Sequence, residues 1–337
     1  MNIKTLAHHL DLSIGTVSRA LNGKPDVSAA TRKRVLEAAV ELGYSANASG
    51  RSLRRGTTQT IAFMLETGQS DLRSGDNFFM RVIDAMQATL AGQGYDLVIL
   101  PCHSSSDPTE YLQRVIARGM ADAIIVTATR RDDPRIALLS KSRLPFLTLG
   151  RTAQADTHPW IDLDFEGILD RTLQELASLG HKRIAVTVPE GGSNIASLLR
   201  EAYAASHARI GLPCDTGLVI PTEVSEYGGN AVTRHILGMP DRPTALILNY
   251  ELMAFGVYTA LTEAGLAAGR DLSVAAFRRS RQLRFLHPTI TACDMDIEAL
   301  GTTLAQETLA LLQDPDRRIG QLWPFDFVRT DSLGPAP

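Results

Sequence analysis

The sequence predicts a small all-helical head followed by a large α/β body made of two Rossmann-like lobes. Over residues 1–45 the apolar residues recur at helical spacing, whereas from residue 60 onward short apolar strands alternate with helices. The sign of the net charge also changes near this boundary. Residues 1–56 hold nine Lys/Arg and four Asp/Glu, a net charge of +5, and the remaining residues carry −8. A basic head on an acidic body suggests that the head meets a polyanion.

Length and composition exclude several classes of protein. The chain of 337 residues, 44% of them hydrophobic, is long enough for two or three domains with buried cores. The three cysteines, Cys102, Cys214 and Cys293, form no C-x-x-C motif, which disfavours a disulfide framework and a zinc site. No apolar run approaches the roughly 18 residues of a membrane span, and the N-terminus lacks the apolar core of a signal peptide. We therefore expect a cytoplasmic protein that uses no metal and no cofactor.

The first 45 residues fit three short helices. The first helix carries a buried stripe at i, i+3, i+4, i+7 spacing: Ile3, Leu6, Ala7 and Leu10. Ser13 is a good N-cap for a second helix that Gly23 ends, and Ser28 is a good N-cap for a third. The predicted buried side of the second helix holds Val17, Ala20 and Leu21.

The outward face of the second helix is unusual for a surface helix because it lacks long Lys and Glu side chains. This face comprises Ile14, Gly15, Ser18, Arg19 and Asn22. Small residues let a helix approach base edges, Ser and Asn can bind phosphates, and Arg can form a bidentate contact with guanine. Two short helices, a tight turn and a third bracing helix make a helix-turn-helix. The alternative is an ordinary amphipathic helix with a solvated outer face.

Four stretches, "TVSRALNG", "VSAATRKRV", "AAVELGY" and "NASGRSL", closely resemble the lactose-repressor (LacI/GalR) family of bacterial transcription regulators. More loosely, the resemblance continues to about residue 330. It implies a helix-turn-helix DNA-binding domain over 1–45, a hinge helix and linker over 46–58, and an effector-binding and dimerisation domain over 59–330. The implied base-reading residues are Ile14, Gly15 and Arg19. The residues implied to contact phosphates or brace the helix are Thr5, Ser13, Thr16, Ser18 and Asn22. Gly15 is a departure, since many relatives carry a larger polar side chain there.

By the same resemblance, residues 47–55 form a hinge helix that binds DNA through Asn47, Gly50 and Leu53. Leu53 would be the leucine pushed into a central base step of the minor groove, which kinks the duplex. Nine residues are too few for a stable isolated helix, and Gly50 weakens it by roughly 1 kcal/mol relative to Ala. The segment is therefore expected to fold only on DNA, beside its twin from a second subunit. The alternative for Leu53 is an apolar residue in a linker.

The body contains two series of strand-like segments. The first is "TIAFML", "DLVIL", "AIIVTA" and "FLTLG", and the second is "WIDLD", "RIAVTV", "GLVIP", "ALILN" and "LSVAAF". Intervening helices, among them 78–92, 108–118 and 297–312, predict parallel, doubly wound sheets. The family's body resembles periplasmic sugar-binding proteins, in which the chain crosses between lobes three times. That implies lobes at about 59–159 plus 289–319 and about 160–288 plus 320–330, with "TITACD" in the first lobe.

The body lacks the motifs of an enzyme. No G-x-G-x-x-G follows a strand, and neither G-x-x-x-x-G-K-[ST] nor G-x-S-x-G occurs. The histidines His103, His158, His181 and His207 are dispersed without metal-ligand spacing, and His181 is better explained as structural. We expect no catalytic residues and a ligand-sensing body. The alternative is a cytoplasmic sugar-binding module, or an enzyme-derived body, with a weakly functional DNA head.

Ligands of doubly wound folds bind at the carboxyl ends of the strands. Positions that match the family's ligand contacts are Phe78, Phe79, Asp164, Arg200 and Asn249, with Asp162 as a rival to Asp164. For either phenylalanine, simple core packing is the alternative. Other strand-end arginines that could add positive charge are Arg130, Arg131 and Arg151.

Two departures from the family pattern concern the ligand's charge. Asn249 is followed by Tyr250 where relatives have Asp, and Arg278 and Arg279 stand where acids are expected. Arg pairs bidentately with carboxylates and phosphates, which predicts an anionic effector such as a sugar acid or sugar phosphate and makes Arg278 an effector-binding residue. In the alternative, Arg278 turns outward or pairs with Asp162 or Asp164, leaving a neutral-sugar site.

Together these expectations describe a homodimeric transcription regulator, favoured as a repressor, of a pseudo-palindromic double-stranded DNA operator. A sugar or sugar derivative bound between the lobes would control operator affinity. The residues after "WPFDFVRTDS" are too few for a coiled coil, so tetramerisation is not expected.

Overall fold

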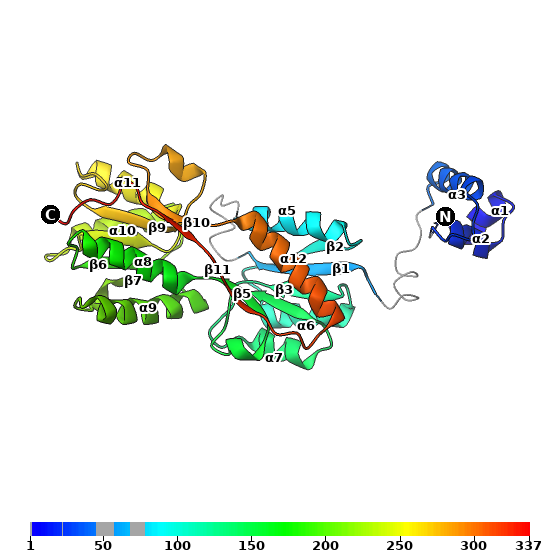
Figure 1. Cartoon of the computed structure of the whole chain (residues 1–337), viewed down its shortest axis with the longest axis horizontal. Helices are drawn as coiled ribbons and strands as arrows, with labels where there is room; N and C mark the ends of the chain where they lie inside the picture. The colour runs from blue at the N-terminus through cyan, green and yellow to red at the C-terminus, as the bar shows by residue number, and fades with distance from the viewer. Residues whose placement is uncertain (1, 22, 45–56, 68–77) are drawn as a thin grey trace. The chain divides into compact units, whose positions relative to one another are not determined.

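A computed structural model describes residues 2–21, 23–44, 57–67 and 78–337 (Figure 1). The chain divides into two compact units, Met1–Thr58 and Gln59–Pro337. The first unit contains the helices α1 (Ile3–His9), α2 (Ile14–Leu21) and α3 (Ala29–Glu41). As expected, the amide of Thr16 donates to Ser13 Oγ at the start of α2 (3.0 Å), and that of Thr31 donates to Ser28 Oγ at the start of α3 (3.2 Å).

One apolar core holds these three helices together. Its fully or nearly fully buried members include Leu6, Ala7, Leu10, Val17, Ala20 and Val35. In addition, Arg34 from α3 donates a hydrogen bond to the carbonyl of Leu10 at the end of α1. The third helix therefore braces the first two, as a helix-turn-helix requires.

The second unit contains two six-stranded sheets, one in each lobe. The first-lobe sheet has the order β11-β5-β4-β3-β1-β2, and all its pairs are parallel. Its strands are β1 (Thr60–Glu66), β2 (Asp96–Cys102), β3 (Ala123–Val126), β4 (Phe146–Leu149), β5 (Trp160–Leu163) and β11 (Gly320–Trp323). The second-lobe sheet has the order β12-β10-β9-β8-β6-β7, in which β12 is antiparallel to β10. Its strands are β6 (Ile184–Pro189), β7 (Val219–Thr222), β8 (Ala245–Leu248), β9 (Ser273–Arg278), β10 (Thr291–Asp294) and β12 (Asp326–Val328).

Helices pack on both sheets and complete the doubly wound fold. Those of the first lobe are α5 (Phe78–Ala91), α6 (Pro108–Arg118), α7 (Pro134–Lys141) and α12 (Ile297–Gln313). Those of the second lobe are α8 (Phe165–Ser178), α9 (Asn194–Ile210), α10 (Glu226–Leu237) and α11 (Met253–Glu263). Every residue of β3 and of β8 is buried, which explains why these strands are unbroken apolar runs rather than alternating ones.

The structure corrects the expected lobe boundaries at three strands. β5 extends the first-lobe sheet beside β4, with Leu149 opposite Ile161, although it was expected in the second lobe. β10 remains in the second-lobe sheet beside β9, and β11 lies in the first-lobe sheet beside β5. The apolar pattern of a strand shows that it is buried but not which sheet buries it. The chain does cross between the lobes three times, within 163–165, 294–297 and 323–326 (Figure 1).

Candidate functional site

A cavity lies between the two lobes, at the carboxyl ends of strands from both sheets. The volume open to the centre of a water molecule is about 160 Å³. About 10–15 Å³ of such volume holds one water, so the cavity has room for a small organic molecule. Its polar lining residues include Glu66, Arg151, Asp162, Asn249, Glu251 and Arg278. Its aromatic lining residues include Phe78, Phe79, Phe165 and Phe277.

The structure brings four of the six predicted effector residues to this cavity: Phe78, Phe79, Asn249 and Arg278. The other two lie outside its lining. Asp164 is the N-cap of α8, where its carboxylate accepts a hydrogen bond from the amide of Gly167 (2.9 Å). Arg200 is exposed on α9 and donates to the carbonyl of Ala196 (3.2 Å). Of the two rival aspartates, Asp162 lines the cavity.

Arg151 is held by groups from two elements, β5 and α8. Its Nε lies 3.1 Å from Asp162 Oδ2 on β5, and its Nη2 contacts Glu166 of α8. The guanidinium also lies 5.5 Å from the ring centre of Trp160. Because Glu166 belongs to the second lobe, this cluster links the two lobes at the wall of the cavity.

The pKa of the Asp162 carboxyl group in this cluster is strongly perturbed. Burial raises the pKa of Asp162 to about 7, even though the charge and hydrogen bonds of Arg151 act in the opposite direction. The group therefore changes its charge near neutral pH, in the wall of the cavity.

We predict that Asp162→Asn flattens the dependence of body stability on pH. A pKa raised above its unfolded value means that the folded state binds the extra proton, so Asp162 contributes stability below about pH 4 that is lost as pH rises through about 7. The whole contribution is at most about 4 kcal/mol. Urea unfolding at several pH values measures this slope. The control Asp241→Asn, with a side chain that is 81% exposed, should keep the wild-type slope. An unchanged slope in Asp162→Asn would contradict the raised pKa.

Arg278 is paired with a carboxylate that the sequence analysis did not identify. Its Nη2 lies 2.6 Å from Glu251 Oε1, and the two side chains are only 12% and 2% exposed. The expected alternative partners, Asp162 and Asp164, were therefore the wrong ones. The sequence did contain an indication of this partner. An arginine at a position where relatives have an acid needs a nearby countercharge, and Glu251 is the first acid after the neighbouring strand "ALIL".

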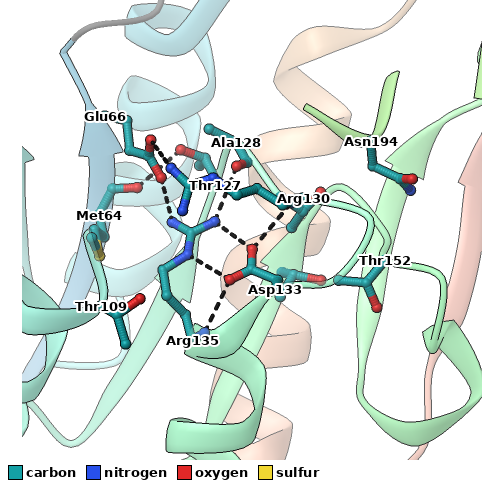
Figure 2. A network of polar contacts seen from close by, with 12 residues as sticks. Met64, Glu66, Thr109, Thr127, Ala128, Arg130, Asp133, Arg135, Thr152 and Asn194 are labelled. Atoms are coloured by element: carbon teal, nitrogen blue, oxygen red, sulfur yellow. Dashed lines mark hydrogen bonds and ion pairs between the residues drawn. The ribbon is translucent and has the colours of Figure 1, made fainter. Parts of the chain in front are cut away.

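A buried ion-pair network stands behind the first-lobe wall of the cavity. Figure 2 shows Arg135, which is fully buried, between Glu66 and Asp133. Its nitrogens lie 2.8 Å from Glu66 Oε1 and 2.7 Å from Asp133 Oδ2, and it donates to the carbonyl of Ala128 (3.0 Å). Arg130 adds a second contact to Glu66 (3.1 Å). Burial raises the pKa of Glu66 against these cations. Burial also acts to raise the pKa of Asp133, but the bonds and charge of Arg135 prevail and lower it.

The remaining strand-end arginines also have acidic neighbours. Arg131 contacts Glu201 of α9 at 2.6 Å, and Arg279 lies 3.7 Å from Asp294. Among the lining residues, the carboxylates of Glu66, Asp162 and Glu251 outnumber the guanidinium groups of Arg151 and Arg278. Over the part of the lining that the structure describes, positive charge therefore does not exceed negative charge.

The two lobes also meet through backbone groups beside the cavity. The amide of Asn194, at the start of α9, donates to the carbonyl of Thr129 (3.0 Å). Its side chain donates to the carbonyl of Arg151 (2.8 Å). Since Thr129, Arg151 and Asn194 all line the cavity, a ligand there touches the same residues that hold the lobes together.

In the first unit, the outward face of α2 is accessible. Ile14, Gly15 and Arg19 are exposed, and Arg19 Nε lies 3.4 Å from Asp26 Oδ2. A Cβ added at Gly15 would lie 3.7 Å from Ser13 Oγ, an ordinary van der Waals distance, so the helix does not require glycine there. Asn22, Asn47, Gly50 and Leu53 lie outside the described residues.

His181 has the structural role expected for it. One ring nitrogen lies 2.7 Å from Thr244 Oγ1 and the other lies 3.0 Å from the carbonyl of Gly334, which ties the C-terminal segment to the second lobe. Over the described ranges, no group of three or more His, Cys, Asp or Glu could hold a metal ion. Within those same ranges, no helix is both long and apolar enough to span a membrane.

A helix-turn-helix unit joined to a two-lobed α/β body with a cavity between the lobes defines the class of protein. Residues 2–47 match the family model for bacterial regulatory proteins of the lacI family, and residues 173–329 match that for a periplasmic binding protein-like domain. The chain is 30% identical to the HTH-type transcriptional regulator AglR of Rhizobium meliloti (strain 1021), over 100% of this chain and 95% of that protein. It is 32% identical to the HTH-type transcriptional regulator RafR of Escherichia coli, over 80% of this chain and 79% of that protein. The chain belongs to the LacI family of bacterial transcriptional regulators.

Solved structures share the whole fold. The lac repressor dimer bound to operator and the anti-inducer ONPF superposes with a TM-score of 0.85 at 22% identity, covering 99% of each chain. The complex of the transcriptional regulator CelR with cellobiose superposes with a TM-score of 0.72 at 23% identity, covering 98% of this chain and 99% of that one. The named relatives are transcriptional regulators rather than enzymes, in agreement with the function expected from the sequence.

Proposed function

We propose that this regulator binds a pseudo-palindromic operator as a homodimer and represses from it, and that a neutral sugar bound between the lobes changes its affinity for that operator. The observation that carries the proposal is the cavity. It joins residues of both lobes, combines aromatic rings with hydrogen-bonding groups, and pairs both of its arginines with acids.

On the DNA side, the proposal rests on the exposed face of α2. The guanidinium of Arg19 suits the acceptor pair of guanine in the major groove, and Ile14 suits a thymine methyl group. The net charge of +5 over residues 1–56 supplies attraction to the phosphates. The lac repressor dimer of similar fold is described as bound to operator, which supports the same arrangement here.

On the effector side, the lining suits a molecule with both apolar faces and hydroxyl groups. Phe78 and Phe79 pack edge to face with ring centres 5.2 Å apart, and Asn249 and Asp162 offer hydrogen-bonding groups. The paired arginines favour a neutral sugar over the sugar acid or sugar phosphate that the sequence suggested. The structure of CelR with cellobiose, and that of a LacI family regulator from Enterococcus faecium with bound ribose, support a sugar.

The contacts between the lobes can couple effector binding to operator affinity. A ligand that touches Thr129, Arg151 and Asn194 alters how closely the lobes approach, and a coupling of about 1–3 kcal/mol changes operator affinity roughly 5- to 150-fold. Such coupling is sufficient for regulation.

Two measurements on the full chain test this function. Selection from random duplexes, followed by fluorescence anisotropy, should yield a palindromic site whose affinity falls steeply with salt. A thermal-shift screen of neutral sugars, sugar acids and sugar phosphates should yield a neutral sugar that raises the unfolding temperature and changes affinity for the selected duplex. Stabilisation by anionic sugars alone would refute the neutral effector. If the selection yields no preferred DNA site, the proposal that the protein is a sequence-specific regulator is refuted.

A further inference from the structure

A short loop of the first lobe, residues 128–131 between β3 and α7, docks on the start of α9 in the second lobe. The amide of Asn194 donates to the carbonyl of Thr129 (3.0 Å), and Arg130 forms an antiparallel bridge with Ser193. Asn194 is the first residue of α9, where a helix offers an amide no partner of its own, and the side chain of Ser193 makes no capping hydrogen bond. The loop, here called the docking loop, therefore satisfies a helix end that belongs to the other lobe.

The docking loop begins in a strained conformation that its own lobe maintains. Ala128 has a φ of 54°, in the left-handed region that favours glycine. A strained backbone of this kind persists only where the surrounding structure holds it. The fully buried guanidinium of Arg135 supplies one such contact, because its Nη2 donates to the carbonyl of Ala128 (3.0 Å).

Asp133 connects the docking loop to this guanidinium (Figure 2). Its Oδ2 accepts hydrogen bonds from the backbone amide of Arg130 (3.1 Å) and from Nη2 of Arg135 (2.7 Å). Its Oδ1 accepts from the amide and from Nε of Arg135, at 3.0 and 2.9 Å. Both carboxylate oxygens are used, so an asparagine at this position would turn an NH₂ group toward an N–H donor. Asp133 thus fixes the loop backbone and also the side chain that holds Ala128.

We propose that Asp133 is a positioning residue, which holds the docking loop in the conformation that receives α9 and thereby sets how the lobes close over the cavity. Asp133 is not among the described residues that line the cavity, whereas Thr129 and Asn194 both line it. Asp133 therefore acts on the cavity through the docking loop. The inference deepens the proposed function and rests on it, because closure of the cavity is what an effector would change.

Hydrogen exchange of the Asn194 amide in the full chain, without any ligand, tests the inference. This amide reports on docking because its hydrogen bond crosses between the lobes. In Asp133→Asn we expect it to exchange at least about tenfold faster than in wild type, since the loop has lost a hydrogen bond to a charged group. Mass spectrometry with electron-transfer fragmentation of the labelled peptides resolves the single amide.

Two control variants separate positioning from chemistry and from stability. Asp107→Asn makes the same change at the start of α6, where Asp107 also precedes a proline and caps its helix by accepting from the amide of Thr109 (2.6 Å). Leu112→Ala removes a fully buried side chain from α6 and so destabilises the same lobe without changing the docking loop. The Asn194 amide should exchange at the wild-type rate in both controls, because it exchanges through local opening between the lobes.

Arg135→Lys replaces Asp133→Asn in the test if the latter does not fold. Lysine keeps the buried cation but lacks the planar fork that reaches both Asp133 and the carbonyl of Ala128, so the same acceleration is expected. An unchanged rate at Asn194 in the folded variant would overturn the inference. Equal acceleration in Leu112→Ala would also overturn it, because Asp133 would then only stabilise its lobe. The measurement uses no sugar, so its failure is distinct from that of the proposed function, which fails if the wild-type protein ignores neutral sugars.

Discussion

Replacing Arg135 with methionine is expected to lower the free energy of unfolding of the two-lobed body by about 3–5 kcal/mol. The side chain of Arg135 is fully buried and contacts Asp133, whose side chain is equally buried, and Glu66. Methionine fills a similar volume but leaves both carboxylates without their central cation. Breaking a buried pair from one side is costly, because the remaining charge stays away from water.

Urea unfolding followed by tryptophan fluorescence measures this loss, because both tryptophans of the chain, Trp160 and Trp323, lie in the body. The loss should shrink as the pH falls. Arg135 lowers the pKa of Asp133, so the wild-type pair stabilises the protein above the usual aspartate pKa and loses that contribution in acid.

The matched control is Arg114→Met. The side chain of Arg114 is 55% exposed near Glu110, so this variant should change stability by less than about 0.5 kcal/mol. A loss below about 1 kcal/mol in Arg135→Met would show that the network is dispensable.

Replacing Arg19 with alanine is expected to weaken operator binding by about 1–3 kcal/mol and to relax the preference at one base position. The side chain is 54% exposed on α2 and near Asp26, and such an exposed pair costs little to separate when Arg19 turns to a base. Anisotropy with a panel of duplexes, each changed at one base pair, measures both effects. Lys4→Ala is the comparison. Lys4 is exposed on α1, and if it contacts a phosphate its loss should weaken binding to every duplex about equally. If Arg19→Ala keeps the wild-type ranking of the panel, Arg19 does not read a base.

Much of the fold follows from short-range patterns. The serine caps before α2 and α3 act within three residues, and the buried stripe of α1 lies within one helix, so both could be predicted locally. The apolar runs that became β3 and β8 are also local signals, since parallel strands covered on both faces need apolar residues throughout.

The candidate site was predicted less completely. Phe78, Phe79, Asn249 and Arg278 line the cavity, and their positions follow from the family resemblance and from the rule that ligands bind at strand carboxyl ends. Asp164 and Arg200 do not line it. A short polar segment after a strand can direct one acid to the cavity and use the next as a helix cap, and spacing alone does not distinguish Asp162 from Asp164.

The sequence by itself determined the helices of the head, the strand and helix alternation of the body, and the family to which both belong. Only the tertiary structure decided which sheet receives β5, β10 and β11. It also decided that Arg278 is neutralised by Glu251 and Arg135 by Asp133 and Glu66. The physical reason is the range of the interactions. Periodicity and capping act between residues a few positions apart, whereas strand pairing and charge compensation depend on which distant strand ends the fold brings within a few ångströms.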